Sequence, residues 1–122
     1  MMKIVWGFVL LMFLLLPATL FAGEADVIKV AVDNSGSNYS FSVTVKHHDE
    51  GWKHYADGWD IVAPGGQVIA TRVLYHPHVS EQPFTRSLSG VVIDDDIDSV
   101  TVRAHDLVHG YGGQEISVKL PN

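Results

Sequence analysis

Apolar residues recur at every second position through most of this sequence, and that period limits the fold more than any other feature. The stretch YSFSVTVK places Tyr39, Phe41, Val43 and Val45 between polar neighbours, the pattern of a half-buried β-strand. Turn-forming residues separate it from similar short stretches, and no helical period occurs after residue 22. We therefore predict an all-β fold, a seven-stranded antiparallel sandwich of immunoglobulin or fibronectin type. The other stretches are 28–32, 59–63, 67–75, 84–93, 100–104 and 116–120.

The first 22 residues differ from the rest. One lysine precedes an apolar stretch (4–16), and a proline with small residues leads to Ala22. This is the layout of a secretory signal peptide that is cleaved after Ala22. The alternative is an uncleaved anchor, because the apolar stretch approaches the ~20 residues that a spanning helix needs. We predict a signal peptide at 1–22, a single β-sandwich domain at 23–122, and a periplasmic or secreted location.

The exported part would be acidic and free of sulfur. The whole chain has 8 Lys and Arg against 14 Asp and Glu, so loss of Lys3 gives 7 − 14 = −7 with histidine neutral. Cysteine is absent, and all three methionines lie in the first 22 residues. We expect a core that holds without disulfides. We also expect neither nucleic acid nor a membrane surface as a partner, apart from the signal peptide.

All seven histidines fall in or beside three long loops. Because successive strands reverse direction, the loops 47–58, 76–83 and 105–113 should share one end of the sandwich, and the tight turns the other. Long loops on a rigid scaffold often carry binding sites, and imidazole is a ligand for zinc, copper(II) and nickel. We therefore predict a divalent metal site at this end. The predicted ligands are His54, His76, His78, His105 and His109.

Two of these histidines flank Pro77, which favours extended chain and so directs both imidazoles to one side. His47 is left out of the ligand set, because it continues the inward alternation of the strand before it and should pack at the strand end. The same histidines would serve equally as loop residues that hydrogen-bond backbone groups or face solvent. Oxygen ligands or hydrogen-bond partners could come from Asp57, Glu81 or Asp106.

An alternative function is recognition of an exported protein or a glycan without metal. Aromatic side chains with polar tips favour binding surfaces, whereas Trp59 and Tyr75 have strand-like neighbours and should pack in the core. No nucleophile motif surrounds the serines, so we expect no enzyme. The acidic turn 94–98 lacks the spacing of a calcium loop. The predicted partner surface comprises Trp52, Tyr55, Asp57, Glu81, Arg86 and Tyr111.

Two strings of the sequence, HPHVSEQPFTRSLSG and RAHDLVHGYGG, resemble an uncharacterised family of small exported bacterial β-sandwich proteins. The resemblance extends over roughly residues 51 to 121. It implies one exported β domain, and it implies no activity, cofactor or catalytic residue.

Overall fold

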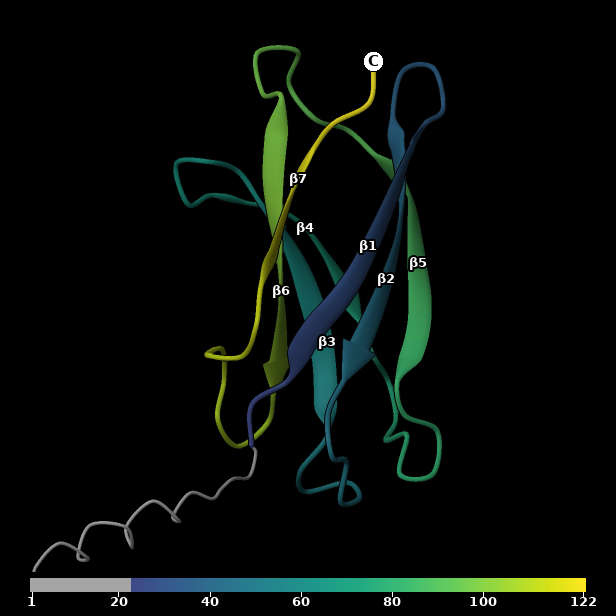
Figure 1. The fold of residues 1–122 in the computed structure, drawn as a ribbon, viewed down its shortest axis with the longest axis vertical. Helices are drawn as coiled ribbons and strands as arrows, with labels where there is room; N and C mark the ends of the chain where they lie inside the picture. The colour runs from purple at the N-terminus through teal and green to yellow at the C-terminus, as the bar shows by residue number, and fades with distance from the viewer. Residues whose placement is uncertain (1–22) are drawn as a thin grey trace, which may run out of the picture.

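The computed structural model describes residues 23–122, and the predicted signal peptide at 1–22 lies outside the described part. Seven strands occur, all paired antiparallel, which confirms the predicted all-β class and strand number (Figure 1). No helix among the described residues is long and apolar enough to cross a membrane. The strands are β1 (Asp26–Asn34), β2 (Tyr39–Lys46), β3 (Ala56–Val62), β4 (Val68–Val73), β5 (Phe84–Val91), β6 (Ser99–Asp106) and β7 (Ile116–Lys119).

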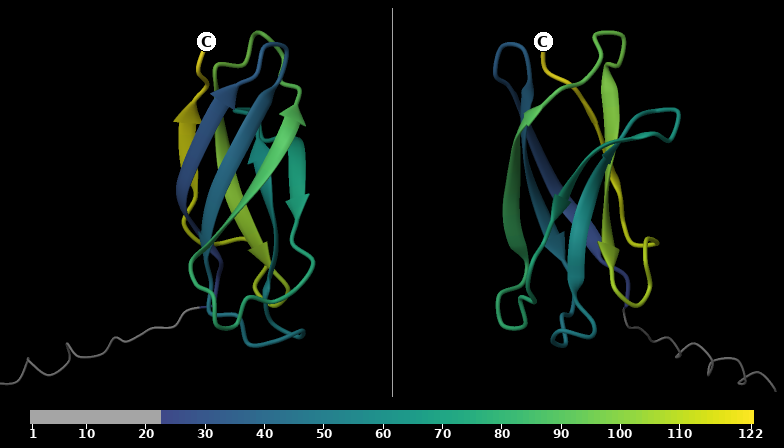
Figure 2. Two further views of the ribbon diagram at one scale, coloured as in Figure 1. Left: turned by 90° about the vertical axis from the view of Figure 1, so that its right-hand side faces the viewer. Right: turned by 180° about the vertical axis from the view of Figure 1, so that it is seen from behind.

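The strands form two sheets that face each other (Figure 2). One sheet has the order β1-β2-β5 and the other the order β4-β3-β6-β7. The chain therefore changes sheet between β2 and β3, between β4 and β5, and between β5 and β6. Each sheet turns one face inward, which is why the sequence alternates between apolar and polar positions.

The core lies between the sheets and is built from the alternating residues. Trp59 and Ile61 of β3 are fully buried, and Phe41 of β2 and Val102 of β6 meet them in the same apolar cluster. The prediction that Trp59 packs in the core is confirmed. The same prediction for Tyr75 is wrong: its side chain is 73% exposed, because β4 ends at Val73 and the chain has already left the sheet.

The start of β1 departs from simple alternation. Val27 is fully buried whereas Ile28 is 40% exposed, and the pairing register with β2 shifts between Val27 and Lys29. Such a bulge inserts one residue and so exchanges the two faces of the strand. Beyond the bulge, Val30 and Val32 pack against the core. The inward alternation expected from residue 28 therefore begins at Val30.

The three long loops lie at one end of the sandwich, together with the start of the described chain (Figures 1 and 2). We call this end, formed by residues 47–55, 74–83 and 107–115, the loop end. The tight turns and the C-terminus lie at the opposite end (Figure 1).

Shortening a core side chain should measurably lower the free energy of unfolding. Ile61→Val removes one buried methylene group, and we expect a loss of about 0.5–1.5 kcal/mol. The control is Val92→Ala, at a side chain 73% exposed, for which the change should stay within about 0.5 kcal/mol. Urea unfolding followed by tryptophan fluorescence measures both. Equal losses would contradict this assignment of the core.

Candidate metal centre

A buried carboxylate, Asp106, organises the loop end. Its side chain is fully buried, and its Oδ2 atom lies 2.8 Å from His47 Nε2, 2.9 Å from His54 Nε2 and 3.0 Å from His109 Nδ1. Its Oδ1 atom accepts a hydrogen bond of 2.6 Å from the backbone N–H of His109. Three imidazole nitrogens thus converge on one carboxylate oxygen. We call His47, His54, Asp106 and His109 the histidine–carboxylate cluster.

Strand alternation and two turns place these four residues. Asp106 ends β6 on the same inward face as Val102 and Ala104. His47 follows β2 directly and continues its inward face, which leaves the residue 3% exposed. His54 precedes β3 in a short turn, and His109 lies in the turn that the backbone of Asp106 closes. The cluster therefore lies where the inward faces of both sheets reach the loop end.

The outer ring nitrogens of two histidines are held by further carboxylates. His47 Nδ1 lies 2.5 Å from Oδ1 of Asp49, whose residue is only 2% exposed, and His54 Nδ1 lies 2.6 Å from Glu50 Oε1. Metal-ligating histidines almost always donate the outer N–H to a carboxylate, a carbonyl or water in this way. The arrangement fixes both rings with Nε2 directed at Asp106.

His47 meets acceptors on both sides of its ring. Its Nε2 atom lies 2.9 Å from the carbonyl oxygen of Gly23, in addition to Asp106. A cation bound between Nε2 and the oxygens would satisfy these acceptors. One ligand atom from each of His47, His54 and Asp106 lies within 4.8 Å of the others. A metal with ligand bonds of about 2.0–2.2 Å could bind all three after small side-chain movements.

The hydrogen bonds of the cluster change two pKa values in opposite directions. Burial opposes ionisation of Asp106, but hydrogen bonds from His109, His54 and His47 outweigh it and lower the pKa to about 2. The hydrogen bond to Glu50 raises the pKa of His54 despite partial burial, and Asp106 raises it further. Both shifts favour the charged forms. The metal-free site is therefore an ion-pair network.

The structure separates His76 and His78 from this cluster. The ring of His78 stacks on Phe84 with 4.0 Å between centroids, and its Nε2 lies 2.9 Å from Arg86 Nη2. Burial lowers the pKa of His78, and the charge of Arg86 lowers it further. The exposed ring of His76 lies 4.8 Å from that of His78. This pair forms its own corner with Arg86, which Glu81 approaches at 3.7 Å.

His105 lies on the outer face of its sheet, because it alternates with the inward residues of β6. Its Nδ1 atom is 2.6 Å from Asp57 Oδ1, and Tyr111 lies edge-on to its ring at 4.9 Å. These groups line a hollow of about 240 Å³ that Asp60 and Thr71 also border. Of the predicted ligands, only His54 and His109 therefore meet in the histidine–carboxylate cluster.

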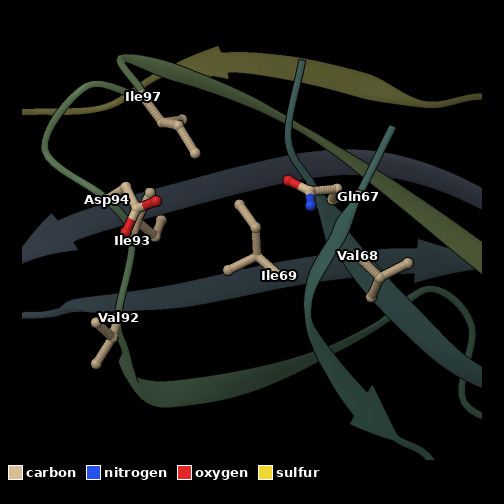
Figure 3. A pocket seen from close by; sticks show the side chains of 7 residues that line it. All are labelled: Gln67, Val68, Ile69, Val92, Ile93, Asp94 and Ile97. Atoms are coloured by element: carbon tan, nitrogen blue, oxygen red, sulfur yellow. The ribbon is translucent and has the colours of Figure 1, made fainter. Parts of the chain in front are cut away.

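A second hollow, of about 220 Å³, lies between the start of β4 and the connection from β5 to β6 (Figure 3). Five of its seven lining residues are aliphatic, and Asp94 is its one ionisable residue (Figure 3). None of its lining residues is a histidine. The loop end remains the chemically distinctive part of the described chain.

Sequence reasoning placed three residues of the site outside the ligand set. His47 was expected to pack at a strand end; it is indeed buried, yet its Nε2 faces Asp106. Asp49 carried no prediction, and Gly23 was predicted only as the first residue after cleavage. A usable signal was the stretch HHDEGWKH, in which Asp49 follows His47 by two residues and His54 follows Glu50 by four. That spacing pairs each histidine with a local carboxylate.

Comparisons with known proteins identify a similar sequence and a similar fold, but they assign no chemistry. No protein-family model matches the chain. A protein of Halomicrobium mukohataei named "Putative lipoprotein" is 41% identical over 96 residues, which are 78% of this chain and 47% of that protein. The chain thus spans about half the length of this relative, whose name states no activity. An uncharacterised family, as the sequence strings imply, is consistent with this relative.

Among solved structures, a hypothetical protein of Pyrococcus horikoshii matches with a TM-score of 0.54 and 13% identity. The match covers 80% of this chain and 90% of that chain. At this level of identity, the similarity concerns the fold alone.

Acid should reveal the ion-pair network in the metal-free protein. Because the folded state lowers the pKa of Asp106 from 3.8 to about 2, its contribution is present above pH 4 and lost as the pH falls through 2. The difference corresponds to about 2 kcal/mol of unfolding free energy. Asp106→Asn should remove this part of the pH dependence, as urea unfolding between pH 5 and 2 would measure. Parallel curves for the two proteins would contradict the network.

Proposed function

We propose that this chain is an exported β-sandwich domain of immunoglobulin type that binds one divalent transition metal at its loop end. Three ligands come from His47, His54 and Asp106, and His109 lies beside them. The apolar N-terminal stretch supports export, as does the relative's name, which describes a lipoprotein. Residues 23–122 would then be the exported domain, in the periplasm or outside the cell.

The observation that carries the proposal is the convergence of imidazole nitrogens on Asp106 Oδ2. Both Nε2 atoms and that oxygen face one point, and the outer nitrogens of both rings are held by Asp49 and Glu50. Two rings oriented by carboxylates and directed at a third carboxylate form the donor set of a metal site with outer support.

The donor chemistry favours zinc, copper(II) or nickel. Two imidazoles and one carboxylate suit these ions, whereas copper(I) prefers thiolate and thioether ligands. The exported part offers neither, because cysteine is absent and every methionine lies within residues 1–22. Three protein ligands also leave room for a further ligand in a four-coordinate site.

Substitution of a ligand should lower the affinity for metal, and substitution of a neighbouring histidine should not. We expect His47→Ala and His54→Ala each to weaken zinc or copper(II) binding at least tenfold, because each removes one of three ligands. The matched control is His48→Ala, an exposed histidine next to His47, which should leave the affinity unchanged. Isothermal titration calorimetry gives the dissociation constants, and elemental analysis of untagged protein gives the metal content.

The same series distinguishes the two arrangements of histidines. If His76→Ala or His105→Ala weakened binding while His47→Ala did not, the metal would bind outside the histidine–carboxylate cluster. Wild-type protein that takes up none of the three metals would contradict the proposed function altogether.

A second candidate function is recognition of an exported protein or glycan by the aromatic side chains of the loop end. The observation that favours it is Trp52, which is 66% exposed and lies edge-on to Tyr55 with 5.8 Å between centroids. Exposed aromatic side chains are often the residues that contribute most to binding. Here Trp52→Ala should abolish partner or glycan binding and leave metal affinity unchanged, whereas His47→Ala should do the reverse.

A further inference from the structure

Gly23 is part of the metal centre, although it lies outside every strand. Its carbonyl oxygen is 2.9 Å from His47 Nε2, the same nitrogen that faces Asp106. Its α-carbon lies against the ring of His109. A β-carbon at position 23 would approach His109 Cε1 to 2.5 Å and Nε2 to 2.6 Å, closer than real side chains come. The imidazole thus occupies the space that any other residue at this position would need.

The segment that carries Gly23 is held in place. Ala25 is 1% exposed within the core cluster, and the backbone N–H of Val27 donates a hydrogen bond to the Gln114 carbonyl. Asp26 Oδ1 accepts a hydrogen bond of 2.8 Å from the Gln114 N–H. Only Glu24 and Ala25 therefore separate Gly23 from the anchored start of β1. A group attached at Gly23 has little freedom to leave the site.

The predicted cleavage point lies at this residue. Cleavage after Ala22 would make Gly23 the first residue of the exported protein and convert its peptide nitrogen into a primary amine. In a peptide bond the nitrogen lone pair is delocalised into the carbonyl group, so the nitrogen is a poor ligand. The amine has a localised lone pair that binds a metal once its proton is lost. Removal of the signal peptide would thus add a nitrogen ligand to a site that otherwise has three protein ligands.

Simple geometry places this amine within reach. A residue's nitrogen lies no more than about 3.6 Å from its own carbonyl oxygen at standard bond lengths. The oxygen of Gly23 already contacts His47 Nε2. The amine and carbonyl of one residue can also bind the same ion as a five-membered chelate ring. The amine alone adds a fourth ligand to His47, His54 and Asp106, which completes a four-coordinate zinc site. The chelate adds a fourth and a fifth ligand, which suits a tetragonal copper(II) site.

We propose that removal of the signal peptide completes the metal centre by supplying the α-amino group of Gly23 as a ligand. This inference depends on the proposed function, because it extends the ligand set of that same site. Its consequence is regulatory: the unprocessed chain inside the cell has only three ligands, and tight binding begins after export. The metal is then acquired in the exported compartment.

The test compares two forms of the domain that differ only in the first nitrogen. One is residues 23–122 beginning at Gly23, purified after export and verified by intact mass. The other carries an N-acetyl group on the same Gly23. We expect acetylation to weaken copper(II) binding at least tenfold at unchanged stoichiometry. The electron paramagnetic resonance spectrum should show one nitrogen ligand fewer, and the metal-free forms should have equal melting temperatures.

Three outcomes would overturn the inference alone, and a fourth would overturn the proposed function with it. Equal affinities with identical spectra would show that the amine is not a ligand, and the proposed function would stand on His47, His54 and Asp106. A lower affinity with an unchanged number of nitrogen ligands in the spectrum would show that the amine affects binding through its charge and is not a ligand. An exported protein that begins at another residue would remove the amine from the site. If neither form binds metal, there is no affinity for His47→Ala to lower, and the proposed function fails together with the inference.

Discussion

The loop end depends on the burial of one charge. Asp106 has no access to solvent, and an isolated carboxylate in such a position would cost several kcal/mol. The fold compensates with hydrogen bonds from three imidazoles and one backbone N–H. These donors come from the β2–β3 and β6–β7 loops, which belong to connections in different parts of the chain. Because the three imidazoles share Oδ2 of Asp106, the positions of both loops are set by the same oxygen atom.

A second buried carboxylate, Asp49, joins the loop 74–83 to the loop 47–55. Asp49 Oδ1 accepts a hydrogen bond from the Ala56 N–H and contacts His47 Nδ1, whereas its Oδ2 accepts a hydrogen bond of 2.7 Å from the His78 N–H. Gln82 adds a parallel link, because its side chain bonds the His47 N–H and the His78 carbonyl. The backbone of residues 76–78 thus supports the candidate metal centre. The His78 ring instead stacks on Phe84 beside Arg86, and the His76 ring is exposed.

Much of the fold could be predicted from the sequence, and the centre of the site only in part. Alternation identified the strands because a sheet with one buried face requires it. Strand reversal likewise placed the three long loops at one end. Alternation also placed His47 inward, but it says nothing of what an inward side chain meets across the sandwich. Convergence of His47 with Asp106, 59 residues later, depends on how the two sheets stack. The bulge after Val27 was similarly invisible, because Ile28 is as apolar as its neighbour.

The candidate metal centre and the fold are separable, and this follows from where the apolar residues lie. The core cluster runs between the sheets from Trp59 and Phe41 to Leu120, with no contribution from metal. In the described structure, contacts with the histidines pair the buried carboxylate of Asp106. A small zinc finger lacks such a core and unfolds without its ion. Here the sandwich holds the candidate ligands in place without an ion. Under the proposed function, the energy of metal binding would therefore be available for selecting the ion, because the core already supplies the energy of folding.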